Sequence, residues 1–530
     1  MACAPEPYVS PLVWDGADNM VFRPLVGLFA VRAPREAVNV NAFDEVPDSA
    51  WFTNRIGRKH PPLPELLRGA CAPELLLPDD PPAEGTWIID RGKTDGASLG
   101  FRVRTKAGSK YMFKNDAPNQ PERATAASAI GAAIYHAVGF NTSCEQIVYF
   151  DRKALHLNPG LTSKDNSGMT KAFDTQALDR VLSEANRRGP LFRMQASAWL
   201  EGYLLGPFRY EGTRRDDPND IIPHEERREL RGGRVLAAWI NHFDAREQNS
   251  MDAWFAAGSK VPDSSPGHVL HYYIDTSDCF GSEWQWDGIS RRLGHSYVFD
   301  WADVGLDTVT FGFAVRPWER VQRRNGFELF GYYSADEFQP AAWKNEYPNA
   351  AFSRATEHDN AWMARILSRF DDADISALVK LGDFTKPEHA AYLEEVLELR
   401  LQRILGRYFA ELSPLSDPQL TATGQLCLTD LARRRGVWPE RAFQYTASVH
   451  DHTGAAVIGA AAPLRKPLGG GVCVALPELP IAPDVAHDSA QRYFTVTIDN
   501  GISRYPVRIH LYDLGAEGHR VVGLERPDSR

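Results

Sequence analysis

The stretch Ile240-Asn-His-Phe-Asp-Ala-Arg-Glu-Gln-Asn249 gathers histidine, carboxylate and amide side chains within one short segment. His242, Asp244 and Asn249 are spaced as H-x-D-x-x-x-x-N. The residues before this stretch run from charged to apolar, which predicts a helix that ends at a polar loop. After a gap, Leu270-His-Tyr-Tyr-Ile-Asp275 predicts a strand that ends at a carboxylate. The sequence therefore predicts a loop and a strand end that present their polar side chains to a common site.

These side chains suit phosphoryl transfer. A carboxylate at Asp244 can orient a hydroxyl group and accept its proton. Asn249 and Asp275 offer oxygen ligands for magnesium ions, which neutralise charge that develops on the phosphates of ATP. Asp278 is a second metal ligand or a turn residue. A single match to this spacing arises by chance in a long chain, and His242 alone would more often be a core or capping residue, so the prediction depends on the combination.

Composition narrows the remaining classes of protein. The 530 residues are 43% apolar and 11% aromatic, which is enough for several domains with sizeable cores. The 59 basic and 69 acidic residues give a formal charge of 59 − 69 = −10. This leaves no basic excess for binding a phosphate backbone, so nucleic acid is not an expected partner. The sequence contains no apolar run of about 18 residues, so it predicts no transmembrane segment. The chain as written is expected to be cytoplasmic.

The cysteine near the N-terminus leaves open an alternative location of the protein in the cell. The opening Met1-Ala-Cys-Ala4 precedes a proline-rich stretch, so the chain could also be a membrane-anchored lipoprotein, lipidated at Cys3 after removal of a signal peptide. The other cysteines are far apart and form no C-x-x-C pair, which favours buried thiols over a zinc site or a disulfide framework. They are Cys71, Cys144, Cys279, Cys427 and Cys473.

The chain divides into four regions of different sequence pattern. Residues 1–85 are rich in proline and acidic side chains, and they predict an extended N-terminal arm. Residues 86–165 predict an antiparallel sheet with a helix, and residues 166–412 are dominated by helical periodicity. Alternating residues return in 413–530, which predicts a β-rich C-terminal region. The expected fold class is α+β. The elements expected in the second region are strands at 86–89, 99–104, 110–114 and 147–150 and a helix from Pro121 to Gly139.

The order of these elements resembles the small lobe of the protein-kinase-like superfamily. The elements follow in the order strand, glycine-containing turn, strand, a strand that carries Lys114, helix and strand. The H-x-D-x-x-x-x-N loop comes later in the chain. The resemblance covers about residues 86–412. It implies a two-lobed fold with a small lobe at 86–165 and a large lobe at 166–412, outside which lie the arm and a C-terminal β-rich appendage.

The resemblance also implies a nucleotide site. Lys114 would contact the α- and β-phosphates of ATP, and Glu122 at the start of the helix would pair with Lys114. The loop between the first two strands would cover the nucleotide, because glycine lets backbone amides approach phosphate closely. The loop residues implied in this binding are Gly92, Lys93, Gly96 and Gly100.

Three features depart from regulatory protein kinases. The glycines are spaced by fours, the interval from Lys114 to Glu122 is short, and no Phe-Gly follows Asp275 directly. The first two are more similar to divergent branches, the HipA-like, aminoglycoside and lipid kinases. The expected function is an ATP- and Mg²⁺-dependent phosphotransferase with Asp244 as base, acting on an unidentified hydroxyl-bearing protein or small molecule. The alternative is a catalytically degenerate kinase-fold protein that serves in binding or scaffolding.

Overall fold

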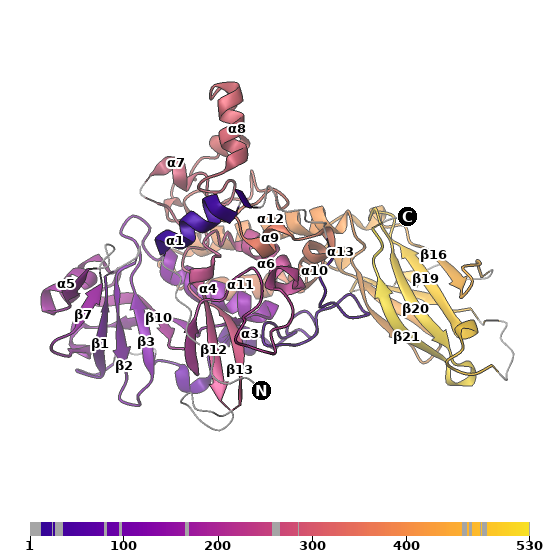
Figure 1. Ribbon diagram of the computed structural model, residues 1–530, viewed down its shortest axis with the longest axis horizontal. Coiled ribbons are helices and arrows are strands. Elements are labelled where there is room, and N and C mark those ends of the chain that lie inside the picture. The colour runs from indigo at the N-terminus through magenta and orange to yellow at the C-terminus, as the bar shows by residue number, and fades with distance from the viewer. Residues whose placement is uncertain are drawn as a thin grey trace.

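The protein is a mixed α+β chain in which three regions lie along one long axis (Figure 1). The computed structural model describes residues 12–23, 25–26, 35–78, 82–94, 98–164, 169–256, 266–284, 286–457, 464–465, 469–477, 479 and 485–528. Cys3 and Gly96 lie outside these residues. Within them, no helix combines the length and the apolar composition that crossing a membrane requires.

The first sheet is antiparallel apart from one edge strand, and it is curled around a core of large apolar side chains. Alternate residues of its strands point inward, so that Ile89, Phe101, Val103 and Phe113 are all fully buried. The strand order is β5-β10-β3-β2-β1-β6. The strands are β1 (Trp87–Lys93), β2 (Gly100–Arg104), β3 (Lys110–Lys114), β5 (Glu145–Phe150), β6 (Leu155–Leu157) and β10 (Leu191–Ala198), with β9 (Arg187–Arg188) paired to β10.

The position of β10 corrects the predicted boundary at residue 166. β10 pairs with β3 on one side and with β5 on the other, so it lies inside the sheet and not in a following unit. Between β5 and β10 the chain adds β6 and β9 to the first sheet and also forms a subsidiary layer that contacts β1 through β7. This layer comprises η3 (Arg152–Ala154), the hairpin of β7 (Thr162–Lys164) and β8 (Thr170–Ala172), and α5 (Thr175–Glu184).

Helix α4 (Arg123–Val138) lies between this sheet and the helical region. Small side chains dominate it, and nearly every residue is buried, because both of its faces are covered. The helix starts after Glu122, whose φ of 70° is left-handed. It ends at Gly139, where φ is 140° and a Cβ atom would lie 2.4 Å from the ring of Phe52. Only glycine fits at that position.

The helical region surrounds α6 (Arg228–Ile240), which delivers the predicted loop. Helices α10 (Glu357–Leu367) and α12 (Pro387–Phe409) pack against α6, and α11 (Asp372–Lys380) packs against α12. A second sheet of order β11-β12-β13-β4 follows the loop. Its strands are β11 (Tyr203–Gly206), β12 (Ser250–Ala256), β13 (Gly267–Tyr273) and β4 (Asn141–Thr142), and the shorter helices of this region are η4 (His224–Glu226), η5 (Glu247–Asn249), α7 (Asp287–Ser290), α8 (Trp301–Thr310), η6 (Pro317–Arg320), η7 (Glu328–Phe330) and α9 (Ala350–Ser353).

The N-terminal arm is part of the core. Val46, Trp51, Phe52 and Ile56 are buried and belong to the same hydrophobic cluster as α4, α6 and α12. The arm is also less extended than predicted, because its described residues include four helical segments: α1 (Leu12–Ala17), η1 (Asp18–Phe22), α3 (Leu63–Arg68) and η2 (Pro73–Leu75).

The region after residue 412 forms two four-stranded sheets around a core of its own. One sheet has the order β14-β15-β18-β17 and the other β16-β19-β20-β21. The strands are β14 (Leu415–Leu420), β15 (Gln425–Asp430), β16 (Thr446–Asp451), β17 (Leu464–Arg465), β18 (Gly471–Ala475), β19 (Tyr493–Asp499), β20 (Val507–Asp513) and β21 (His519–Glu525), and the helical turns are α13 (Leu431–Arg434), η8 (Glu440–Ala442), η9 (Ala490–Arg492) and η10 (Gly515–Glu517).

Two disulfides contradict the prediction of buried thiols. Cys71 in the arm is bonded to Cys144, which directly precedes β5. Cys427 and Cys473 join the neighbouring strands β15 and β18. Cys279 is a buried thiol, as expected. The sequence spacing gave no sign of either bond, because 73 and 46 residues separate the partners.

The Cys71–Cys144 bond should contribute to stability by closing a long loop in the unfolded chain. We expect Cys71→Ser to lower the free energy of unfolding by about 2–4 kcal/mol in denaturant titrations. A reductant should destabilise the wild type, and its effect should be smaller on the variant, in which only the second disulfide remains. Thiol titration of the denatured, unreduced chain should leave four of the six cysteines unreactive. Six reactive thiols would contradict both bonds.

Candidate functional site

The predicted loop begins where α6 ends. Asn241 adopts a left-handed conformation with φ of 54°, which stops the helix, and its Oδ1 accepts a hydrogen bond of 2.9 Å from Trp343 Nε1. His242 is fully buried, and its Nδ1 lies 2.7 Å from the hydroxyl of Tyr135. Burial lowers the pKa of His242 to about 4, so the ring is neutral at physiological pH. His242 therefore anchors the loop to α4.

Asp244 is held by contacts to its backbone and to its side chain. Its N–H donates to Asp278 Oδ2 at 2.9 Å, and its carbonyl accepts from Asn249 Nδ2 at 2.8 Å. The carboxylate forms an ion pair of 2.7 Å with Arg246 Nε. Burial raises the pKa of Asp244, and the nearby charge of Asp275 raises it further, while Arg246 opposes the shift. The result is a fixed carboxylate that is more basic than an ordinary aspartate.

Asp275 is the second residue after β13 and faces Lys114 at the end of β3. Lys114 Nζ lies 2.7 Å from Asp275 Oδ2, and the hydroxyl of Ser277 donates to Asp275 Oδ1 at 2.6 Å. Burial would raise the pKa of Asp275, but Lys114 and Ser277 outweigh it and hold that pKa well below the usual range. The same pair raises the pKa of Lys114 against the effect of burial. Both side chains are thus charged.

Asp278 completes the group of carboxylates. It is buried, and its Oδ1 accepts no hydrogen bond from any residue that the structure describes, with His242 Nε2 3.4 Å away. Burial raises the pKa of Asp278 well above its usual range, and the negative charges of Asp244 and Asp275 act in the same direction. The site therefore crowds carboxyl groups together, so that ionisation of one opposes ionisation of the next.

Glu346 is a member of this site that the sequence did not reveal. Its Oε2 accepts from Arg246 Nη1 at 3.0 Å, so that Arg246 bridges Glu346 and Asp244. Burial raises the pKa of Glu346 to about 9, and the charge of Asp244 contributes to the shift. Glu346 is thus a neutral carboxyl group at physiological pH. No local sequence pattern marks Glu346 as a site residue. Arg246 lies within the loop at 240–249, so its position in the sequence could have indicated that it belongs to the site.

The predicted pair between Lys114 and Glu122 is wrong. Glu122 accepts hydrogen bonds from the backbone N–H of Thr385, at 3.0 Å, and from its hydroxyl, which ties the start of α4 to the loop before α12. The second carboxylate near Lys114 is instead Glu145 at the start of β5. Glu145 accepts hydrogen bonds from Ser143, Gln195 and Ser197 at 2.5, 2.8 and 2.6 Å.

Packing explains why glycine stands near the end of β1 and at the start of β2. A Cβ atom on Gly92 would lie 2.2 Å from the ring of Phe173, and one on Gly100 would lie 2.0 Å from the carbonyl oxygen of Phe113. Lys93 donates to the carbonyl of Ser98 at 2.8 Å, and its charge lowers the pKa of Asp275, so it lies near the site. Gly96, the remaining predicted member, lies outside the described residues.

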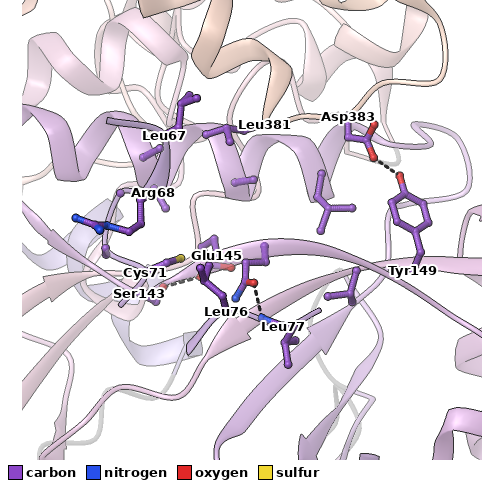
Figure 2. A pocket seen from close by; sticks show the side chains of 18 of the residues that line it. Leu67, Arg68, Cys71, Leu76, Leu77, Ser143, Glu145, Tyr149, Leu381 and Asp383 are labelled. Atoms are coloured by element: carbon purple, nitrogen blue, oxygen red, sulfur yellow. Dashed lines mark hydrogen bonds between the residues drawn. The ribbon is translucent and has the colours of Figure 1, made fainter. Parts of the chain in front are cut away.

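A cavity of about 670 Å³ lies between the arm, α4 and β5 (Figure 2). Leucine and alanine side chains form much of its wall, and Cys71 and Glu145 also line it. Its polar groups bind one another: Tyr149 donates to Asp383 at 2.8 Å, and Gln146 Oε1 accepts from the backbone of Leu77 at 2.9 Å. Because these groups already have partners, the cavity offers less chemistry than the carboxylate site.

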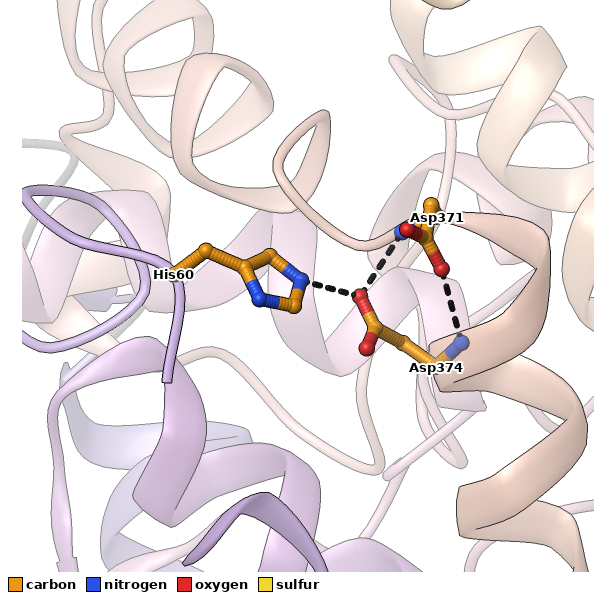
Figure 3. Close-up of side chains that lie close together, drawn as sticks. All are labelled: His60, Asp371 and Asp374. Atoms are coloured by element: carbon orange, nitrogen blue, oxygen red, sulfur yellow. Dashed lines mark hydrogen bonds and ion pairs between the residues drawn. The ribbon is translucent and has the colours of Figure 1, made fainter. Parts of the chain in front are cut away.

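His60, Asp371 and Asp374 form a separate cluster at the start of α11 (Figure 3). One ligand atom of each residue lies within 4.8 Å of the others, so the cluster could hold a cation. Both carboxylates already cap the helix, since each accepts a 2.9 Å hydrogen bond from the backbone N–H of the other. His60 Nε2 lies 2.7 Å from Asp374 Oδ2. The contacts therefore explain the cluster as a helix cap that also fixes the arm.

In comparisons with known proteins, no family model, no curated protein and no solved structure matches this chain. The function has to be argued from the site itself.

Proposed function

We propose that the protein is an ATP-dependent phosphotransferase that acts on a hydroxyl group. The observation that supports this best is the convergence of Lys114, Asp244, Asn249, Asp275 and Asp278. A buried ion pair joins Lys114 to Asp275, and hydrogen bonds join Asp244 to Asn249 and Asp278. A lysine, a candidate base and several oxygen ligands are the parts that phosphoryl transfer needs in one place.

The order of elements supports a divergent, two-lobed protein-kinase-like fold as part of this proposal. Strands β1, β2 and β3 are followed by α4 and β5, and Lys114 is the last residue of β3. The long helix α6 then leads into the loop, and β13 ends just before Asp275. Strand β10 would complete the small lobe, which moves the start of the large lobe beyond residue 198.

The residues present fit Mg²⁺. Asn249 uses its Nδ2 in a hydrogen bond to the carbonyl of Asp244, which leaves its Oδ1 available as a ligand. Asp278 Oδ1 is buried without a hydrogen bond among the described residues, and Asp275 is ionised. Asn249, Asp275 and Asp278 would therefore hold the metal, which when bound would neutralise charge on the phosphates of ATP. A cation at this site would favour the ionised forms of the crowded carboxyl groups.

The chain's own residues would divide the remaining work. Asp244 would orient the acceptor hydroxyl and take its proton, and its raised pKa improves it as a base. Arg246 and Glu346 would keep Asp244 in position. Arg123 donates to the carbonyls of Ser277 and Cys279 at 2.6 and 3.1 Å, and so fixes the segment that carries the metal ligands. Lys114 would contact the phosphates, as the resemblance implies.

Nucleotide binding can be tested through the metal ligand. We expect Asp275→Asn to abolish the rise in melting temperature that Mg²⁺-ATP gives the wild type, because it removes an anionic ligand at nearly constant volume. The matched control is Asp179→Asn on the surface of α5, where the side chain is 61% exposed. An unchanged shift in the Asp275 variant would contradict the metal assignment. Loss of the shift in Asp278→Asn alone would move the main ligand by three residues.

The competing proposal is a binding or scaffolding protein on a catalytically degenerate kinase fold. It is favoured by the absence of Phe-Gly directly after Asp275, where Thr276 and Ser277 stand instead.

The two disulfides bear on the location of the protein. They favour an oxidising compartment, since such bonds are rare in the cytosol. They thus support the lipoprotein alternative over the cytoplasmic expectation. The acceptor is open between a protein, a small molecule and a lipid headgroup.

A further inference from the structure

Helix α8 projects from the body of the protein as an isolated stalk (Figure 1). It has no buried residue. At its tip Val309, Phe311 and Phe313 are 79%, 88% and 87% exposed. Single exposed apolar residues are ordinary, but a group of nearly bare apolar side chains at the end of a projection indicates a contact surface.

The charges of the stalk lie along one side of α8 as far as Asp307, and they are paired there. The chain returns from the tip to Arg316, whose guanidinium binds Asp303 and Asp307 of α8 at 3.2 and 2.6 Å. Arg316 also binds Glu319 at 3.1 Å. Between Thr308 and Val315 no residue is charged. The stalk thus changes from paired ions at its base to a wholly uncharged tip.

The apolar surface of α8 extends around more than half of the helix, beyond what docking of one face requires. At about 100° per residue, Trp301, Val304, Leu306 and Val309 span an arc of about 200°, and the acidic stripe occupies the side toward Arg316. A helix that docks one face on a protein needs an apolar stripe of about 100°. The breadth of the arc, and the aromatic rings beyond the end of the helix, suit immersion in an apolar medium better than one-sided docking.

Two hydroxyl groups and one backbone N–H near the tip are bonded within the stalk. The hydroxyl of Thr308 donates to the carbonyl of Val304 at 2.7 Å, and that of Thr310 donates to Leu306 at 2.8 Å. The N–H of Gly312 donates to the carbonyl of Asp307 at 2.9 Å. Internal bonding of this kind is what a lipid environment demands, because hydrocarbon offers no partner to a polar group.

We infer that the stalk anchors the protein to a lipid bilayer by inserting its tip among the acyl chains. A helix of ten residues is about 15 Å long, which exceeds the depth of about 5–10 Å that interfacial segments reach. Asp303 and Arg316 then lie at headgroup level, and Asp307, about one turn before Phe311, marks the limit of insertion. Because those ions are already paired, the attraction comes from apolar burial and not from anionic lipid.

The test uses the whole protein and vesicles of phosphatidylcholine, alone or mixed with phosphatidylglycerol. We expect co-sedimentation with both kinds of vesicle and little change between low and high salt. The double substitution F311S/F313S should lower the partition coefficient at least about tenfold. The matched control is Ile221→Ser, which removes an apolar side chain that is 79% exposed and lies outside the stalk. This control should bind vesicles as the wild type does.

Three results would overturn the inference: failure of the wild type to bind either kind of vesicle, equal binding by the double variant, or binding that needs phosphatidylglycerol and vanishes in high salt. Light scattering after size exclusion adds a further check. If the wild type self-associates and the double variant does not, while neither binds vesicles, the stalk joins copies of this chain. Because no step involves ATP, failure here leaves the proposed phosphotransferase untouched, and the reverse also holds.

Discussion

Asp244→Asn should lower the rate of phosphoryl transfer by roughly a hundred- to ten-thousand-fold while leaving the Mg²⁺-ATP thermal shift intact. The substitution removes the proton acceptor and the ion pair that its carboxylate makes with Arg246. The hydrogen bonds that Asp244 makes to Asn249 and Asp278 use its backbone, so asparagine preserves them. The measurement is ATP turnover or autophosphorylation at saturating Mg²⁺-ATP, followed by pooled hydroxyl-bearing metabolites and proteins as acceptors.

Glu346→Gln is the control for this experiment. With a pKa of about 9, Glu346 is protonated at physiological pH, and glutamine reproduces a neutral group of similar shape. We expect turnover to stay close to that of the wild type. A wild type that binds Mg²⁺-ATP but transfers phosphate to nothing, with Asp244→Asn indistinguishable from it, would favour the degenerate binding protein.

What the sequence predicted well was local in the chain. The strand at 110–114 has the bounds expected from its side-chain periodicity, and the helix expected from Pro121 to Gly139 forms as α4 (Arg123–Val138). The spacing of the quoted loop likewise placed Asp244 beside Asn249, because a loop this short keeps its members close. Periodicity and spacing act over a few residues, and within that range they sufficed.

The errors concern contacts between distant residues. Glu122 bonds Thr385, which is 263 positions away, and Glu346 lies 100 positions from Arg246. Strand β10 lies in the first sheet between β3 and β5, although both of these strands come much earlier in the chain. Such pairings depend on how the whole chain collapses, and no local pattern of apolar residues encodes them.

Asp44 joins three distant parts of the molecule through one buried carboxylate. It binds Arg228 at the start of α6, Arg365 of α10 at 3.0 Å, and Arg526 of the C-terminal tail at 2.7 Å. Burial opposes the charge of Asp44, but the three guanidinium groups outweigh it and hold the pKa well below the usual range. Burial and the neighbouring Arg365 lower the pKa of Arg526 to about 10. Arg228 also pairs with Asp359 and Arg365 with Glu45, each at 3.2 Å, so Asp44 is the anion that all three arginines share.

Asp44→Asn should therefore lower the free energy of unfolding by about 3–5 kcal/mol, because it removes the carboxylate that Arg526 pairs with and one of the two that Arg228 and Arg365 each pair with. The control is Asp48→Asn on the exposed side of the arm, where about 1 kcal/mol or less is expected. Since the pKa of Asp44 is depressed by folding, its contribution is present above the unfolded value of about 4 and is lost as the pH falls below it. In urea titrations the gap between wild type and variant should shrink toward acid pH. A gap that stayed constant, or an Asp44 variant as stable as the Asp48 control, would show that the arginines find solvent or other partners and that Asp44 does not hold the three parts together.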